Sequence, residues 1–141
     1  MLTMTKWLWL IILVLGLVPL VIGIMLVTAV PGARNQLETA LASPAGTKVE
    51  DIDKILVASK TKVVQMFEAT EGKCATDPTN AYWEGFWAAS NTASGMGMAK
   101  LSLGVLRLTR MVGILNIVIG LALVFTGLGV KIIVEAAVKT A

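Results

Sequence analysis

The sequence lacks histidine altogether and holds a single cysteine, Cys74, among its 141 residues. Without histidine the chain has no imidazole to act as a general base, a transition-metal ligand or a haem ligand. One thiol forms neither an internal disulfide nor a zinc or iron–sulfur site. Phosphate-binding glycine motifs are absent too. We therefore predict that the protein is not an enzyme and has no metal or cofactor site.

Charged residues are scarce as well. They make up 15% of the chain against 56% for apolar residues, and the mean hydropathy is +0.80. Typical soluble domains hold about 25% charged and about 45–50% apolar residues. The net charge of +3 is spread along the chain without a basic run, so nucleic acid is not an expected partner. This composition predicts a membrane protein whose first partner is the lipid bilayer.

Two long uncharged runs bracket a polar middle segment. They cover 24 residues at 7–30 and 20 residues at 111–130. The first, as a helix, is about 36 Å long and exceeds a hydrocarbon core of about 30 Å. We predict an all-α membrane protein with two transmembrane helices joined by a helical extramembrane hairpin. The expected domains are 1–30 (first transmembrane helix), 31–110 (extramembrane segment) and 111–141 (second transmembrane helix and short tail).

The charges beside the first run indicate an orientation. Lys6 precedes this run, and a cation ahead of the first span favours a cytoplasmic N-terminus. With two spans, both termini then lie in the cytoplasm and the loop is extracytoplasmic. We expect the plasma (inner) membrane as the location.

The polar middle segment has signals for helix ends. Pro31-Gly32 predicts a break in the first helix, followed by a short helix near 35–42. Thr47 and Glu50 fit a capping box at the start of an amphipathic helix over about 48–70, which Gly72 ends. After a loop at 71–79, Asp77-Pro78 predicts the N-terminus of the next helix.

Half of the chain's eight aromatic residues lie within six positions. Their spacing of i, i+1, i+4 and i+5 places all four on one helix face; they are Tyr82, Trp83, Phe86 and Trp87. Three interpretations stay open: the core of the extramembrane hairpin, a contact with a partner subunit or pigment, or a position in the headgroup layer. We expect Trp83 in the core and Trp87 at a partner.

Glycines in the two runs follow a seven-residue repeat. The repeat comprises Gly16 and Gly23 in the first run and Gly113, Gly120 and Gly127 in the second. Such a repeat keeps small residues on one side of a helix, where another helix can approach closely. Asn116 is the one strongly polar side chain inside a run and is a candidate for a hydrogen bond between helices.

These features predict a non-catalytic accessory or structural subunit of a larger integral membrane complex. Docking would use the glycine-patterned helices and the aromatic cluster, with other membrane-protein subunits as partners. Two alternatives stay open: a small homo-oligomeric pore or holin-like protein, and a small membrane sensor. A pore needs a polar stripe along a span, for which the spans offer only Asn116, Thr28 and Thr126.

Overall fold

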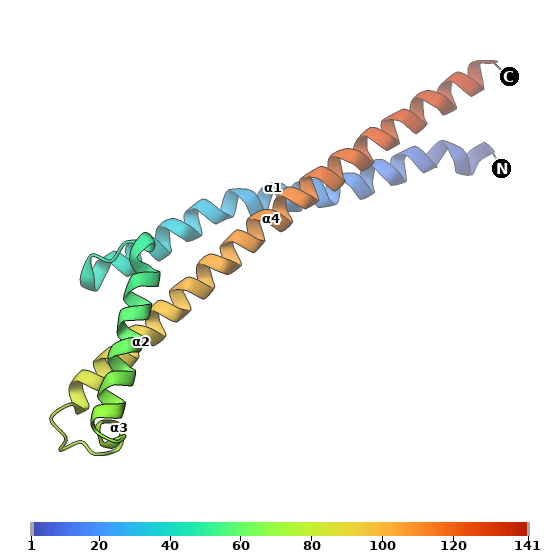
Figure 1. The fold of residues 1–141 in the computed structure, drawn as a ribbon. Helices are drawn as coiled ribbons and strands as arrows, with labels where there is room; N and C mark the ends of the chain where they lie inside the picture. The colour runs from blue at the N-terminus through green and yellow to red at the C-terminus, as the bar shows by residue number, and fades with distance from the viewer. Residues whose placement is uncertain (1, 141) are drawn as a thin grey trace. The chain divides into compact units, whose positions relative to one another are not determined.

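A computed structural model describes residues 2–140 of the chain, with side chains described from Trp7 onward except at positions 43–45 and 140. The described elements, in order, are α1 (Leu2–Ala45), the 3₁₀ helix η1 (Val49–Asp51), α2 (Ile52–Ala69), α3 (Lys73–Thr76) and α4 (Trp83–Thr140) (Figure 1). No strand occurs in this described range. The prediction of an all-α fold is confirmed.

The chain divides into two compact units. The first, called the span unit below, comprises Met1–Ala33 and Leu106–Ala141. The second, called the middle unit, comprises Arg34–Val105. Two helices are long and apolar enough to cross a membrane, with candidate spans inside Trp7–Ala42 and Trp83–Lys139. These two helices indicate a membrane protein, in agreement with the composition.

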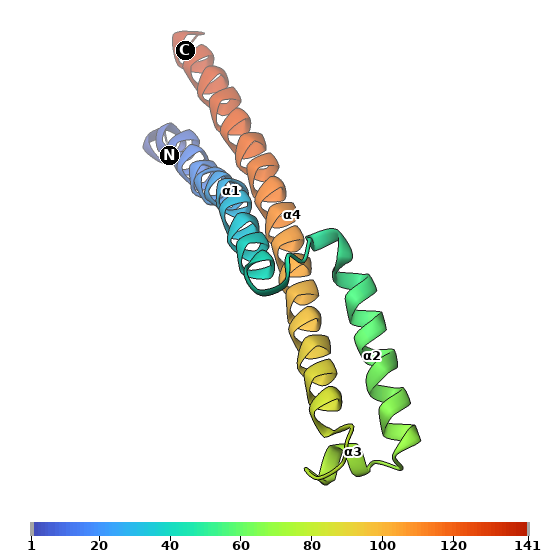
Figure 2. The ribbon, with the colours of Figure 1, turned by 90° about the vertical axis from the view of Figure 1, so that its left-hand side faces the viewer.

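Within the span unit, the N-terminal part of α1 and the C-terminal part of α4 run side by side in opposite directions. Both views place the two chain termini at the same end of this pair (Figures 1 and 2). Buried or half-buried residues of α1 recur at i, i+3, i+4 and i+7 from Trp9 to Val30, and those of α4 do so from Gly113 to Gly127. This seven-residue pattern is typical of two helices that stay in contact over several turns.

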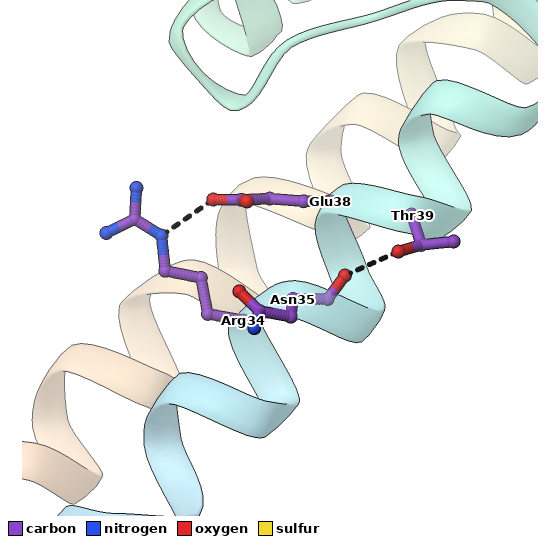
Figure 3. Close-up of polar contacts among 4 residues, drawn as sticks. All are labelled: Arg34, Asn35, Glu38 and Thr39. Atoms are coloured by element: carbon purple, nitrogen blue, oxygen red, sulfur yellow. Dashed lines mark hydrogen bonds and ion pairs between the residues drawn. The ribbon is translucent and has the colours of Figure 1, made fainter.

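The predicted helix break at Pro31-Gly32 is wrong, because α1 continues through both residues to Ala45. Proline removes one backbone hydrogen bond, at a cost of about 3 kcal/mol in a helix interior. The turns that follow are composed mainly of good helix formers and favour continuation. Arg34 Nε lies 2.8 Å from Glu38 Oε1, and the Thr39 hydroxyl donates to the Asn35 carbonyl at 2.8 Å (Figure 3).

The start of α2, in the middle unit, differs from the expected one. No capping box forms at Thr47, since Lys48 is the N-cap residue of η1 and provides no side-chain cap. The Asp51 amide donates to the Lys48 carbonyl at 3.0 Å, so one 3₁₀ turn satisfies the backbone before α2 begins at Ile52. The end of α2 agrees with the prediction: the Gly72 amide donates to the Phe67 carbonyl at 2.8 Å, and Gly72 has a φ of +82°.

The predicted start of the next helix at Asp77-Pro78 is also wrong, because α4 begins at Trp83. The Asp77 carboxylate instead accepts hydrogen bonds from the Thr79 amide at 2.9 Å and the Thr79 hydroxyl at 2.6 Å. These bonds hold the pKa of Asp77 below its ordinary value of 3.8, and the bond from the Thr79 hydroxyl has the larger effect. The aspartate therefore closes a turn of its own, a conformation that competes with helix capping.

Candidate functional site

The repeated glycines of the two spans meet each other inside the span unit. A Cβ atom placed on Gly16 would lie 2.9 Å from Leu123 Cβ and 3.0 Å from the Gly120 carbonyl oxygen. One placed on Gly23 would lie 2.6 Å from the Gly113 carbonyl oxygen. Real Cβ atoms do not approach backbone this closely, so only glycine fits at these positions.

The register of this contact, called the glycine seam below, repeats along both helices. Gly23 faces Gly113. Seven residues earlier in α1 and seven residues later in α4, Gly16 faces Gly120. One further repeat brings Gly127 against Trp9, whose carbonyl oxygen lies 3.1 Å from an added Cβ on Gly127. The glycine faces of the two spans therefore pack against each other within one chain, whereas the sequence predicted only that another helix could approach them.

The polar side chains of the spans do not form a stripe. The Thr28 hydroxyl donates to the carbonyls of Ile24 at 2.9 Å and Met25 at 3.1 Å, on its own helix. The Thr126 hydroxyl does the same with the Ala122 carbonyl at 2.8 Å. Asn116 lies half-buried, three residues after Gly113 and four before Gly120. Both hydroxyls are thus satisfied locally, which leaves little polarity to line a pore.

The four residues of the aromatic cluster have different environments in the middle unit. Phe86 is 8% exposed and lies 6.4 Å, between ring centroids, from Phe67 of α2. Trp87 is 41% exposed and packs edge-on against Phe86 at 5.5 Å and Trp83 at 5.7 Å. Tyr82 precedes α4 and is 53% exposed. The buried ring of Phe86 therefore supports Trp87, which in turn packs against Trp83 and is the more open of the two indoles to solvent.

Further contacts join α2 to the first part of α4. Lys100 Nζ lies 2.8 Å from Asp53 Oδ1, and an added Cβ on Gly85 would lie 3.1 Å from Met66 Cε. The buried apolar side chains described in this unit are those of Ile52, Leu56, Cys74, Phe86, Ala89 and Ala99. They form a small apolar core that fixes the position of the aromatic cluster.

The acidic residues near the start of α2 have structural partners. Asp51 Oδ1 lies 3.6 Å from Lys54 Nζ, and Asp53 pairs with Lys100. In the part of the chain that the structure describes, no group of three or more His, Cys, Asp or Glu side chains is placed to hold a metal ion. The polar contacts therefore account for these carboxylates as ion-pair partners.

One feature at the terminal end of the span unit was missed by the sequence analysis. Lys131 Nζ lies 5.1 Å from the centre of the Trp9 ring, beside a cavity that Lys139 also lines. A signal for it existed in the sequence: the seven-residue repeat that pairs Gly16 with Gly120 also brings Trp9 to Gly127, one turn before Lys131.

Comparison with protein families, curated proteins and solved structures found no match to this chain.

Cys74 offers a direct test of the middle unit's packing. Its side chain is fully buried, so we expect a maleimide to leave the native protein unmodified and to react after denaturation. The control is Thr61→Cys in a Cys74→Ala background, because Thr61 is exposed on α2 and should react at once. Rapid modification of Cys74 in the native protein, measured by mass spectrometry, would contradict this packing.

Proposed function

We propose that the chain is a non-catalytic accessory or structural subunit of a larger integral membrane complex. In this proposal the two spans lie in the plasma (inner) membrane, and the middle unit is an extramembrane helical hairpin on the extracytoplasmic side. The cation ahead of the first span, Lys6, supports this orientation. The exposed residues of the aromatic cluster support a role in docking.

The observation that carries the proposal is the exposed indole of Trp87. Tryptophan is enriched among the residues that dominate binding energy at interfaces. Trp87 is held by edge-on contacts with Phe86 and Trp83, and this lowers the rotamer entropy that it would lose on binding. Tyr82, also exposed, precedes it by five residues. The indoles of Trp83 and Trp87, in contact with each other, form a preorganised aromatic surface on a folded support.

The glycine seam changes how docking would occur. Its glycines pack the two spans of one chain against each other, so they would hold the subunit together and leave the aromatic surface for the partner. The outer faces of the spans carry large exposed apolar side chains, among them Leu15, Val18 and Phe125. Such faces suit lipid or the apolar surface of a neighbouring subunit. A homo-oligomeric pore is the weaker candidate, because Thr28 and Thr126 bond within their own helices.

The test is purification of the tagged full-length chain from its native membranes in mild detergent, followed by mass spectrometry of the proteins that accompany it. We expect defined membrane subunits with the wild-type chain and a loss of at least about 30-fold with Trp87→Ala, equivalent to about 2 kcal/mol. Trp7→Ala is the matched control, because Trp7 is equally a large exposed indole but lies in the span unit.

Two results would contradict the proposal. One is a wild-type chain that purifies alone or only as copies of itself. The other is a Trp87→Ala chain that keeps all its partners. Circular dichroism of each variant separates loss of docking from loss of fold.

A further inference from the structure

A cavity of about 350 Å³ lies at the terminal end of the span unit, and it joins charge with apolar surface. Its lining comprises Trp9, Lys131, Val134, Glu135, Val138 and Lys139. Trp9 comes from α1 and the other five come from the last turns of α4. Both ribbon views show the two helices separating toward their termini at this end (Figures 1 and 2).

The cavity opens where the glycine seam ends. At Gly16 and Gly23 each helix presents a glycine to the other, and the backbones come into contact. At the next repeat α1 presents Trp9 instead, and only Gly127 remains small. The seam position that follows on α4 is Val134, a branched residue that prevents the same close approach. The indole and the valines thus form an apolar wall between diverging helices.

The charges at the cavity favour an anion. Lys131 Nζ lies 5.1 Å from the centre of the Trp9 ring, within the range of a cation–π contact. Its Nζ also forms a loose ion pair with Glu135, 3.9 Å from Oε1. Lys139 lies eight residues further along α4, about two turns away, and lines the same cavity. Two lysines therefore line the cavity with one carboxylate.

We propose that this cavity binds the headgroup of an anionic phospholipid. Lys131 and Lys139 would bind the phosphate, while the ring of Trp9, which lies inside the first uncharged run, would contact the adjoining part of an acyl chain. A lipid is favoured over soluble phosphate because the cavity adjoins the end of an uncharged run, at the level where headgroups meet water. Lysines near an anionic membrane surface attract such lipids. This inference requires membrane insertion but not membership of a complex.

The test uses the purified full-length protein in detergent, mixed with equal amounts of phosphatidylglycerol and phosphatidylcholine, with native mass spectrometry as the readout. We expect the wild-type chain to retain phosphatidylglycerol preferentially. Lys131→Gln/Lys139→Gln should lose this preference by roughly 25-fold, from about fivefold for each lysine. Lys60→Gln/Lys62→Gln is the matched control, because it removes the same charge from exposed positions on α2.

Lys139→Gln alone is a second variant that should not disturb the fold, because Lys139 is exposed. It should lower retention about fivefold with unchanged helical content by circular dichroism. Equal losses in the cavity and control variants would overturn the proposal, since attraction would then follow net charge alone. Displacement of the lipid by inorganic phosphate would also overturn it, because the site would then take a free anion. A chain that retains phosphatidylglycerol but purifies without other subunits would support this site and contradict the proposed function.

Discussion

Gly120→Ala should destabilise the pair of spans, whereas Gly129→Ala in the same helix should stabilise it slightly. A Cβ on Gly120 would lie 2.7 Å from both the Cβ and the backbone nitrogen of Leu20, and 2.8 Å from the Gly16 carbonyl oxygen. Backbone atoms cannot rotate away as a side chain does, so the helices must move apart. Overpacking of this kind costs about 1–3 kcal/mol.

The control, Gly129→Ala, should shift the stability in the opposite direction. Gly129 has nothing within 4 Å of an added Cβ, so alanine meets open space there. Alanine is the better helix former by about 0.5–1 kcal/mol. Thermal unfolding of both variants in the same detergent, followed by circular dichroism, measures the two signs. Equal shifts in the same direction would mean that the close contact at Gly120 does not exist in the folded protein.

Phe86→Ala should unfold the middle unit, while Trp87→Ala should leave it folded. Phe86 is 8% exposed and packs against Phe67 across the α2–α4 contact. Removing a buried phenylalanine costs about 3–5 kcal/mol. That is a large share of the few kcal/mol that a core of this size supplies. Trp87, at 41% exposed, leaves no comparable cavity when it is truncated.

Limited trypsin digestion of the purified full-length variants is the measurement. The middle unit contains several lysines, among them Lys54, Lys60 and Lys73, so its unfolding exposes cleavage sites. Phe86→Ala should be cut rapidly in this region, and Trp87→Ala should be cut at the wild-type rate. If Trp87→Ala is cut as fast as Phe86→Ala, the exposed indole belongs to the core, and its role as a docking residue is lost.

Composition and periodicity predicted the all-α fold and the two candidate spans, because both depend on the nature of residues over long segments. The seven-residue glycine repeat likewise follows from helix geometry alone. The repeat does not predict which helix packs against it. The pairing of Gly23 with Gly113 and of Gly16 with Gly120 depends on the connection between the spans, which a local pattern does not encode.

Local signals failed where two conformations compete for the same residues. Asp77 is suited both to a helix N-cap and to a turn through Thr79, and the structure has the turn. Pro31 disfavours a helix interior, yet the helix-forming residues around it carry α1 to Ala45. Thr47 and Glu50 have capping-box spacing, but a 3₁₀ turn occupies that place. Each outcome depends on the balance of neighbouring turns.

The aromatic cluster shows a similar limit. Helical spacing placed four rings on one face, but α4 begins at Trp83, so Tyr82 lies outside the helix. Phe86 is the buried ring because Phe67 of α2 packs against it. The sequence predicts Trp83 in the core, whereas the structure has Trp83 half-buried and Phe86 buried. Whether a ring is buried is decided by the element that packs against it.

Disulfide formation measures directly whether the glycine seam closes within one chain. Leu26→Cys and Gly113→Cys, combined in a Cys74→Ala background, place two thiols across the seam. An added Cβ on Gly113 lies 3.1 Å from Leu26 Cβ, close to the separation of about 3.5–4.5 Å in a disulfide. The control pair is Leu26→Cys with Leu115→Cys, because Leu115 is 58% exposed and points away from the seam. On mild oxidation in membranes, we predict rapid formation of a disulfide within single chains for the first pair and little for the control. Disulfides that instead join two chains, or that form equally in both pairs, would show that the two spans of one chain do not pack through these glycines.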